Sequence, residues 1–160
     1  MDIKIFKQVP RIVFGRGAID GLAQVLDDFR KNSYIVFIVD HVHKTTGLLE
    51  LLKIEKNDEI ILADTSDEPK TTQIDALRDE ILVSKSGQIP DLVVGIGGGS
   101  AMDIAKAVSV MLTNEGSSTS YQGWDLVKNK AVPKIAIPTL SGTGAEASRT
   151  SVLTGKDKKF

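Results

Sequence analysis

Short apolar runs alternate with amphipathic stretches along this chain, and that alternation constrains its fold more than any other feature. Runs rich in β-branched residues predict buried strands, and apolar residues spaced three and four apart predict helices. The predicted strands are 11–15, 34–40, 59–64, 91–97 and 134–139, and the predicted helices are 18–29, 48–52, 71–82 and 100–112. Strands that alternate with helices form βαβ crossovers. The sequence therefore predicts an α/β fold in which helices cover both faces of a mostly parallel sheet.

Length and charge limit the classes of partner that the chain can have. The 160 residues are enough for one domain with a hydrophobic core. The net charge of −1 gives no long-range attraction to nucleic acid or to an anionic membrane. The absence of cysteine excludes disulfides and thiol catalysis. The apolar runs are far shorter than a membrane span, and the first residues lack a signal peptide's apolar core, so we expect a soluble, cytoplasmic protein.

The stretch "GIGGGSAMDIAKAV" joins a predicted strand to a predicted helix through four closely spaced glycines. The first N–H groups of a helix have no partner within it, and the helix dipole attracts an anion. Gly97, Gly98 and Gly99 would let a phosphate approach the backbone, and Ser100 could cap the helix or bind the phosphate through its hydroxyl. The alternative is a tight turn without a ligand. The G-x-G-x-x-G fingerprint is incomplete, because Ser100 occupies its last position.

Two aspartates near this turn are candidate cofactor ligands. Asp40 ends the strand 34–40, where a carboxylate can accept hydrogen bonds from a ribose diol and repel a 2′-phosphate, which favours NAD over NADP. Its alternative is an exposed aspartate in a turn. Asp103 lies three residues after Ser100, a spacing that suits either a capping box or a ligand. Lys106, one helical turn further along, is expected to be solvated.

Hydroxyl side chains follow the strand 134–139 in a second turn that contains glycine. Thr139, Ser141, Thr143 and Ser148 would suit a polar group such as the ribose or carboxamide of a nicotinamide nucleotide. The alternative is an ordinary loop rich in serine and threonine.

His41 and His43 are the only histidines of the sequence. Alternate residues of a strand share a face, so the pair could chelate a metal ion. No third ligand is evident near them, and we therefore expect solvated loop histidines. A metal site made of three histidines is excluded within this chain.

Three stretches together resemble the iron-containing alcohol dehydrogenase family, which is related in fold to dehydroquinate synthase and glycerol-1-phosphate dehydrogenase. They are "RIVFGRGAIDGL", "GIGGGSAMDIAKAV" and "AIPTLSGTGAEAS", and the resemblance covers residues 11–160. It implies a Rossmann-like, three-layer parallel sheet of the dehydroquinate-synthase type, in which residues 1–160 form the N-terminal NAD-binding domain. The cofactor that it implies is NAD.

The resemblance also implies roles at matching positions. The glycine turn would hold the NAD pyrophosphate, the carboxylate after the strand 34–40 would bind the adenosine ribose, and the second turn would line the nicotinamide. Glu68 lies where members have a polar residue near the adenine, and Lys159 where they often have a lysine near the cofactor. With Asp103 added, the candidate cofactor residues are Asp40, Glu68, Gly97, Gly98, Gly99, Ser100, Asp103, Thr139, Leu140, Thr143, Ser148, Val152 and Lys159.

Two departures from the family pattern bear on the substrate. Leu140 stands where the family commonly has the second of two threonines. Arg149 lies in a segment that is normally small or apolar, and its guanidinium could clamp a carboxylate, which suggests an anionic substrate. The stretches "YQGWDLV" and "SGTGAEASRT" together resemble a subgroup that oxidises the terminal alcohol of a sugar acid, the 3-deoxy-D-manno-octulosonate 8-oxidases.

Family members are much longer than this chain, and a helical C-terminal domain absent from it holds their divalent metal, iron or zinc, with one aspartate and three histidines. No residue here is assigned to that metal. The resemblance predicts the cofactor-binding half of an NAD-dependent, metal-dependent alcohol dehydrogenase, inactive as an isolated chain. The alternatives are half of a dehydroquinate-synthase-like or glycerol-1-phosphate-dehydrogenase-like enzyme, and an inactive nucleotide-binding fragment. The expected partner is a small alcohol or sugar acid; nucleic acid and membrane are not expected, and a homodimer is left open.

Overall fold

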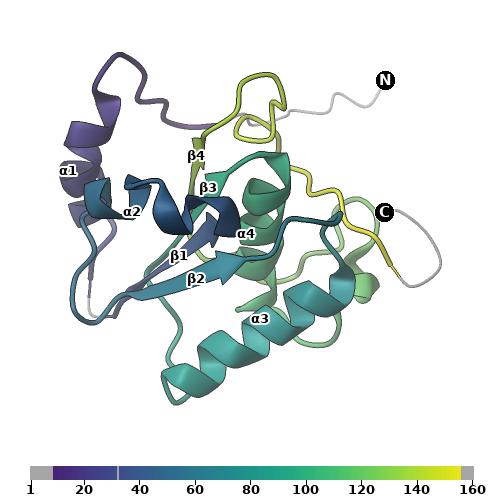
Figure 1. Ribbon diagram of the computed structural model, residues 1–160. Coiled ribbons are helices and arrows are strands. Elements are labelled where there is room, and N and C mark those ends of the chain that lie inside the picture. The colour runs from purple at the N-terminus through teal and green to yellow at the C-terminus, as the bar shows by residue number, and fades with distance from the viewer. Residues whose placement is uncertain (1–8, 32, 156–160) are drawn as a thin grey trace, which may run out of the picture.

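Four parallel strands form the sheet of the computed structural model, which describes residues 9–31 and 33–155 (Figure 1). In the order of the sheet they are β2 (Glu59–Ala63), β1 (Ile35–Asp40), β3 (Leu92–Gly97) and β4 (Lys134–Pro138). Every neighbouring pair is parallel. The structure thus confirms the α/β fold with a parallel sheet.

Helices cover both faces of this sheet and make a three-layer structure (Figure 1). The α-helices are α1 (Leu22–Asp27), α2 (Leu48–Leu51), α3 (Thr71–Ser84) and α4 (Gly99–Met111). Three short 3-10 helices, η1, η2 and η3, occupy Ala18–Gly21, His41–Thr45 and Ser118–Tyr121. The predicted helix 18–29 is therefore split between η1 and α1.

Strand β1 is buried on both faces, as its unbroken apolar run predicts. Val36 and Ile38 pack on one side with residues of α3 and α4. Ile35, Phe37 and Val39 pack on the other side with residues of α1 and the segment around α2. The two core clusters thus lie on opposite faces of the same strands, which fixes the register of the sheet.

Two predictions about strands were wrong. Residues 11–15 do not form a strand, and Phe14 is 97% exposed. An extended apolar run becomes a strand only when a neighbouring strand accepts and donates its backbone hydrogen bonds, and no described segment pairs with this one. The predicted strand 59–64 exists as β2, but it lies at the end of the sheet and buries only Ile61 and Ala63.

A buried carboxylate ties the start of β1 to the loop before β2. The Asp58 side chain has no exposed surface, and its oxygens accept two hydrogen bonds from the Arg30 guanidinium, at 2.9 and 2.7 Å. The same oxygens accept the backbone N–H groups of Ile35 and Glu55, at 2.9 and 2.8 Å. Burial alone would raise the pKa of the Asp58 carboxyl, but the hydrogen bonds from Arg30 and the two backbone groups outweigh it and leave the pKa below its usual value.

We expect Asp58→Ala to lower the free energy of unfolding by about 3 kcal/mol at pH 7, because it removes the buried partner of the Arg30 guanidinium and leaves only the exposed Glu55. The matched control is Asp28→Ala, which breaks the exposed ion pair with Arg11 and should cost less than about 1 kcal/mol. Urea denaturation of both variants measures the difference.

The difference in the free energy of unfolding between the unchanged chain and Asp58→Ala should also depend on pH. Since the folded-state pKa of Asp58 lies below its unfolded value near 3.8, its stabilisation is complete above that value and is lost as the pH falls further. The gap between the unchanged chain and Asp58→Ala should therefore narrow below about pH 4. Equal losses for Asp58→Ala and Asp28→Ala would contradict this account of the buried carboxylate.

Candidate functional site

Three chain turns meet where β1, β3 and β4 end at the carboxyl edge of the sheet, which is where ligands bind in folds of this class. The Thr139 N–H, just after β4, donates to the carbonyl of Gly97 at 2.9 Å. His43 Nε2 lies 3.1 Å from the hydroxyl of Thr139, which links the turn after β1 to the turn after β4. The structure therefore brings together the predicted residues Asp40, Gly97 and Thr139, which are far apart in the sequence.

Gly97 is confined between two neighbours and needs its missing side chain. Its φ of +148° is one that residues with side chains rarely adopt. A Cβ atom placed there would lie 2.7 Å from Cβ of both Asp40 and Ala101. The first turn of α4 and the end of β1 can thus approach each other only around a glycine.

The N-terminus of α4 faces the candidate site without a side-chain cap. Gly98 is the N-cap residue, with an ordinary extended backbone, and no side chain bonds to the first amides of the helix. Ser100 is therefore the second residue of the helix and not its cap. The uncapped N–H groups and the helix dipole favour an anion at this point.

The second turn lies directly across from these glycines. A Cβ atom at Gly98 would lie 3.3 Å from Cδ1 of Leu140, and one at Gly99 would lie 3.4 Å from Cβ of Thr143. Leu140 is exposed, so its position over Gly98 is not imposed by the core. The two turns thus form facing walls, whose close approach depends on the absence of side chains at Gly98 and Gly99.

Asp40 is buried, so the alternative interpretation, an exposed aspartate in a turn, does not hold. Its Oδ1 accepts hydrogen bonds from the Thr65 hydroxyl at 2.8 Å and from the Val42 N–H at 3.2 Å. Its Oδ2 lies on the side of Gly97. Sequence reasoning missed Thr65, although its position two residues after β2 puts it at the same edge of the sheet.

Asp103 and Lys106 form a buried ion pair, with 2.7 Å between Oδ1 and Nζ and side chains that are only 12% and 7% exposed. The expectation that Lys106 is solvated was wrong. Its ammonium donates to the Ser148 hydroxyl at 3.0 Å and to the carbonyls of Ala145 and Thr150. Desolvation lowers the pKa of Lys134 at the start of β4, and the charge of Lys106 lowers it further.

The carboxylate of Asp103 points to the second turn as well. Its Oδ2 accepts the Val152 N–H at 3.0 Å, so the predicted residues Ser148 and Val152 both lie against α4 through polar contacts. A capping box would need Asp103 to bond at the helix N-terminus, and no such bond is formed. Asp103 thus contacts the second turn.

The remaining predicted residues lie away from the glycine turn or outside the described chain. Glu68 accepts a hydrogen bond from the Thr154 hydroxyl at 2.8 Å. The Arg149 guanidinium binds Asp125 at 2.8 Å and lies over the Trp124 ring, 5.4 Å from its centre. Lys159 falls outside the described residues.

Neither a metal cluster nor a membrane helix is found in the described chain. Residues 9–31 and 33–155 contain no group of three or more histidine, cysteine, aspartate or glutamate side chains placed to hold a metal ion. Within the same residues, no helix combines the length and the apolar character that a membrane crossing requires. His43 contacts the hydroxyls of Thr46 and Thr139, both at 3.1 Å, instead of a metal ligand set.

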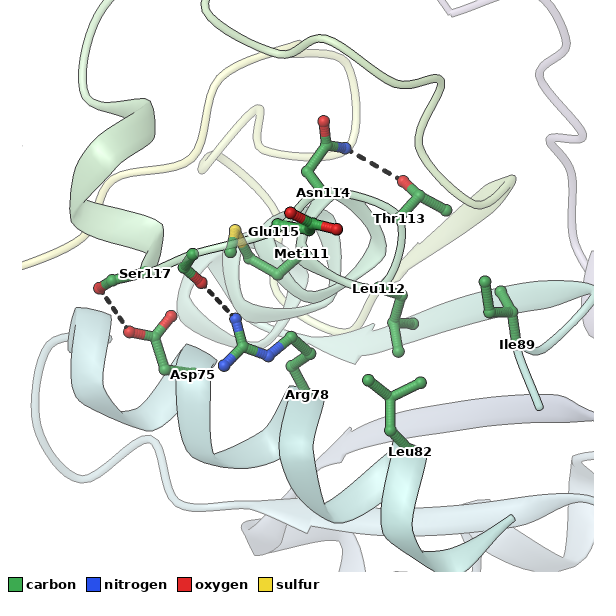
Figure 2. Close-up of a pocket in the computed structure, with 11 residues that line it drawn as sticks. Asp75, Arg78, Leu82, Ile89, Met111, Leu112, Thr113, Asn114, Glu115 and Ser117 are labelled. Carbon is green, nitrogen blue, oxygen red and sulfur yellow. Dashed lines mark hydrogen bonds between the residues drawn. The ribbon is translucent and has the colours of Figure 1, made fainter. Parts of the chain in front are cut away.

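A cavity of about 540 Å³ lies elsewhere, at the opposite end of α4. Figure 2 shows Arg78 and Leu82 extending from α3 toward Met111 and Leu112. Arg78 also donates to the carbonyl of Gly116 at the rim. This cavity contains none of the predicted cofactor residues and is separate from the two glycine turns.

Known proteins resemble this chain in both sequence and fold. The model of the family "Iron-containing alcohol dehydrogenase" matches residues 10–160. The chain belongs to the iron-containing alcohol dehydrogenase family. It is 37% identical to sulfoacetaldehyde reductase of Bilophila wadsworthia over 149 residues, which cover 91% of this chain and 37% of that protein. It is 32% identical to NAD-dependent methanol dehydrogenase of Bacillus methanolicus over 156 residues, which cover 94% of this chain and 39% of that protein.

Solved structures of this alcohol dehydrogenase family share the fold. Sulfoacetaldehyde reductase from Bifidobacterium kashiwanohense, in complex with NAD+, superimposes with a TM-score of 0.79 at 28% identity, over 99% of this chain and 42% of that one. The chain thus spans about two fifths of the length of the relatives and structures that it matches. The predicted family and its Rossmann-like N-terminal fold are confirmed.

The geometry of the glycine turn in this iron-containing alcohol dehydrogenase chain predicts losses of stability that differ in size for two neighbouring positions. Gly97→Ala should lower the free energy of unfolding by about 1–3 kcal/mol, because its Cβ would overlap Asp40 and Ala101. Gly98→Ala should change it by less than about 0.5 kcal/mol, because the only close atom is the end of the exposed Leu140 side chain. Chemical denaturation of both variants measures the two losses of stability. A larger loss for Gly98→Ala than for Gly97→Ala would show that the turn is packed differently.

Proposed function

We propose that this chain is the NAD-binding half of a dehydrogenase that interconverts a small alcohol and its aldehyde or ketone. The observation that carries the proposal is the meeting of the uncapped N-terminus of α4 with the turn after β4, with the Asp40 carboxylate beside them. Two relatives support NAD as the cofactor: one is named an NAD-dependent methanol dehydrogenase, and a structure of another contains NAD+.

Each of these facing walls suits one part of the cofactor. The N–H groups at Gly98, Gly99 and Ser100 would bind the pyrophosphate, whose charge the helix dipole favours. Asp40 would accept the hydroxyls of the adenosine ribose, because Thr65 and Val42 hold its carboxylate in a fixed orientation through Oδ1. Thr139, Leu140 and Thr143 would contact the nicotinamide and its ribose from the other wall.

The chemistry of the proposed reaction belongs to the nicotinamide, which accepts a hydride from the alcohol carbon. This chain would bind and orient the cofactor so that one face of the nicotinamide meets the substrate. The metal that the family name implies finds no ligand cluster among the described residues, so no metal step is derived for this part of the protein. The substrate-binding and metal-binding parts would come from the remaining length that the relatives have.

An anionic group on the substrate is a narrower part of the proposal. Arg149 follows the turn that would line the nicotinamide, and it now binds Asp125 and stacks on Trp124. A carboxylate or sulfonate could replace Asp125 as the partner of the guanidinium. The relative named sulfoacetaldehyde reductase supports an anionic aldehyde, and a sugar acid such as 3-deoxy-octulosonate remains a candidate of the same charge.

We expect NAD to raise the melting temperature of the chain more than NADP does at equal concentration. The 2′-phosphate of NADP would be repelled by Asp40, which is buried and held by Thr65. Thermal unfolding with each nucleotide measures the shift, and Asp40→Asn should reduce the preference. Equal shifts with the two nucleotides would refute the role given to Asp40.

Gly98→Val should weaken NAD binding by at least about tenfold, or 1.4 kcal/mol, because the new side chain would block the approach of the pyrophosphate to the backbone beside Leu140. The melting temperature without nucleotide should stay nearly unchanged. The matched control is Gly21→Val, since Gly21 has an ordinary φ of −83° and open space around its Cβ position. Isothermal titration calorimetry measures the NAD affinity of both variants. Equal affinities in Gly98→Val and Gly21→Val would show that the pyrophosphate binds elsewhere.

A further inference from the structure

We propose that His43 couples binding of the NAD pyrophosphate to the uptake of a proton, because its ring controls the direction in which the Thr139 hydroxyl donates. The proposal rests on the function proposed above, since the anion that it invokes is the pyrophosphate at the N-terminus of α4. His43 is thus a positioning residue that acts through Thr139, and the proton that it takes up comes from the solvent.

The His43 imidazole lies between two threonine hydroxyls. Its Nδ1 is 3.1 Å from the hydroxyl of Thr46, which belongs to the same turn after β1. Its Nε2 is 3.1 Å from the hydroxyl of Thr139, which belongs to the turn after β4. Within the part of the chain that the structure describes, the ring forms no other hydrogen bond. A change in the protonation of this ring therefore acts on these two hydroxyls.

Thr46 determines which ring nitrogen carries the hydrogen in the neutral imidazole. A hydroxyl has one proton, and the hydroxyl of Thr46 donates its proton to the carbonyl of His43 at 3.3 Å. The Thr46 oxygen can then only accept a hydrogen bond from the ring, so Nδ1 carries a hydrogen and donates it. Nε2 of the neutral ring is left as an acceptor, and the Thr139 hydroxyl donates to it.

Protonation of His43 reverses the hydrogen bond to Thr139. Both nitrogens of an imidazolium are donors, so Nε2 donates to the Thr139 oxygen and the hydroxyl proton of Thr139 becomes free to bond elsewhere. Thr139 is exposed, and its backbone N–H donates to the carbonyl of Gly97 at 2.9 Å, beside the N-terminus of α4. The released hydroxyl can thus donate to an anion at that N-terminus, whereas the neutral ring keeps the hydroxyl proton for itself.

An imidazolium at His43 has no counter-ion among the described residues. The Asp40 carboxylate lies 3.4 Å from the ring of His41, the other histidine of this turn, and forms no ion pair with His43. Lys44 of η2 and Glu146 of the turn after β4 are exposed, and neither is bonded to His43. A bound pyrophosphate would supply the missing negative charge, so the protonated ring and the bound cofactor stabilise each other.

This coupling fixes the direction in which the NAD affinity changes with pH. The complex holds the proton more firmly than the free chain does. NAD should therefore bind more tightly as the pH falls through the range in which histidine side chains become protonated, about 5 to 8. The phosphates of NAD keep the same charge over this range, so a change in affinity reports a group of the protein.

The test measures the NAD affinity by isothermal titration calorimetry at about pH 6 and about pH 8. The unchanged chain should bind NAD about fivefold more tightly at the lower pH, whereas His43→Gln should show less than about a twofold difference. The matched control is His41→Gln, which removes the other histidine of the same turn and should keep the pH dependence. Titrations in buffers of different ionisation enthalpy should show proton uptake on NAD binding in the unchanged chain and in His41→Gln, but not in His43→Gln.

Variants of Thr139 test the hydroxyl itself. Thr139→Val should lower the NAD affinity more at the lower pH than at the higher one, because the hydroxyl donates to the cofactor only when His43 is protonated. Thr139→Ser, which keeps a hydroxyl, should retain the pH dependence of the unchanged chain. An equal loss of affinity at both pH values in Thr139→Val would overturn the proposal, because it indicates a merely structural role.

Failure of this coupling and failure of the proposed function give different results. If the unchanged chain binds NAD with the same affinity at both pH values, or if His43→Gln keeps the pH dependence, the coupling is refuted while the proposed function stands. If the unchanged chain binds no NAD at either pH, the proposed function fails and the coupling fails with it. If His43→Gln does not fold, His43→Asn replaces it in the same comparison, with the same outcomes.

Discussion

The rest of the structure depends on how closely helix α4 approaches strand β3. Two glycines make this approach possible: a Cβ at Gly95 would lie 2.5 Å from Cβ of Ala105, and one at Gly97 would lie 2.7 Å from Cβ of Ala101. Because α4 lies so near the strand, its first turn comes beside Asp40 and below the turn after β4. The convergence of three polar turns at one edge of the sheet is thus a consequence of backbone packing in the core.

The fold could be predicted from the sequence wherever the residues of a segment by themselves determine its structure. β1 and β3 were predicted because residues buried on both faces form an unbroken apolar run. Residues 11–15 contain a similar but shorter apolar run, yet Ile12 and Phe14 are exposed, because a strand also needs a neighbour and composition does not supply one. The half-buried state of β2 was missed for a related reason, since only the order of strands in the sheet decides which strand lies at its end.

Prediction of the candidate site was limited in the same way, because the surroundings of a polar residue depend on segments distant in the sequence. The pattern Asp-x-x-Lys occurs at 28–31, 67–70, 103–106 and 125–128. The pairs at 67–70 and 103–106 each form an ion pair of 2.7 Å, whereas Asp28 and Asp125 pair with arginines distant in the sequence. The first pair is exposed and the second is buried, because a loop some forty residues further along the chain folds back over the second. Local spacing therefore permits the two charges to meet, but the tertiary structure decides whether they do and in which environment. Thr65 was missed for this reason also.

Strand β2 has a consequence for how the chain behaves in concentrated solution. It is an outer strand among the described residues, and Ile60 and Leu62 are exposed on the face that carries no helix over them. An outer strand with apolar side chains presents unpaired backbone N–H and C=O groups and an apolar surface. Both features favour edge-to-edge association with a second copy. With a net charge of −1, repulsion between copies is weak. This edge of the sheet therefore favours association between copies of the chain at high concentration.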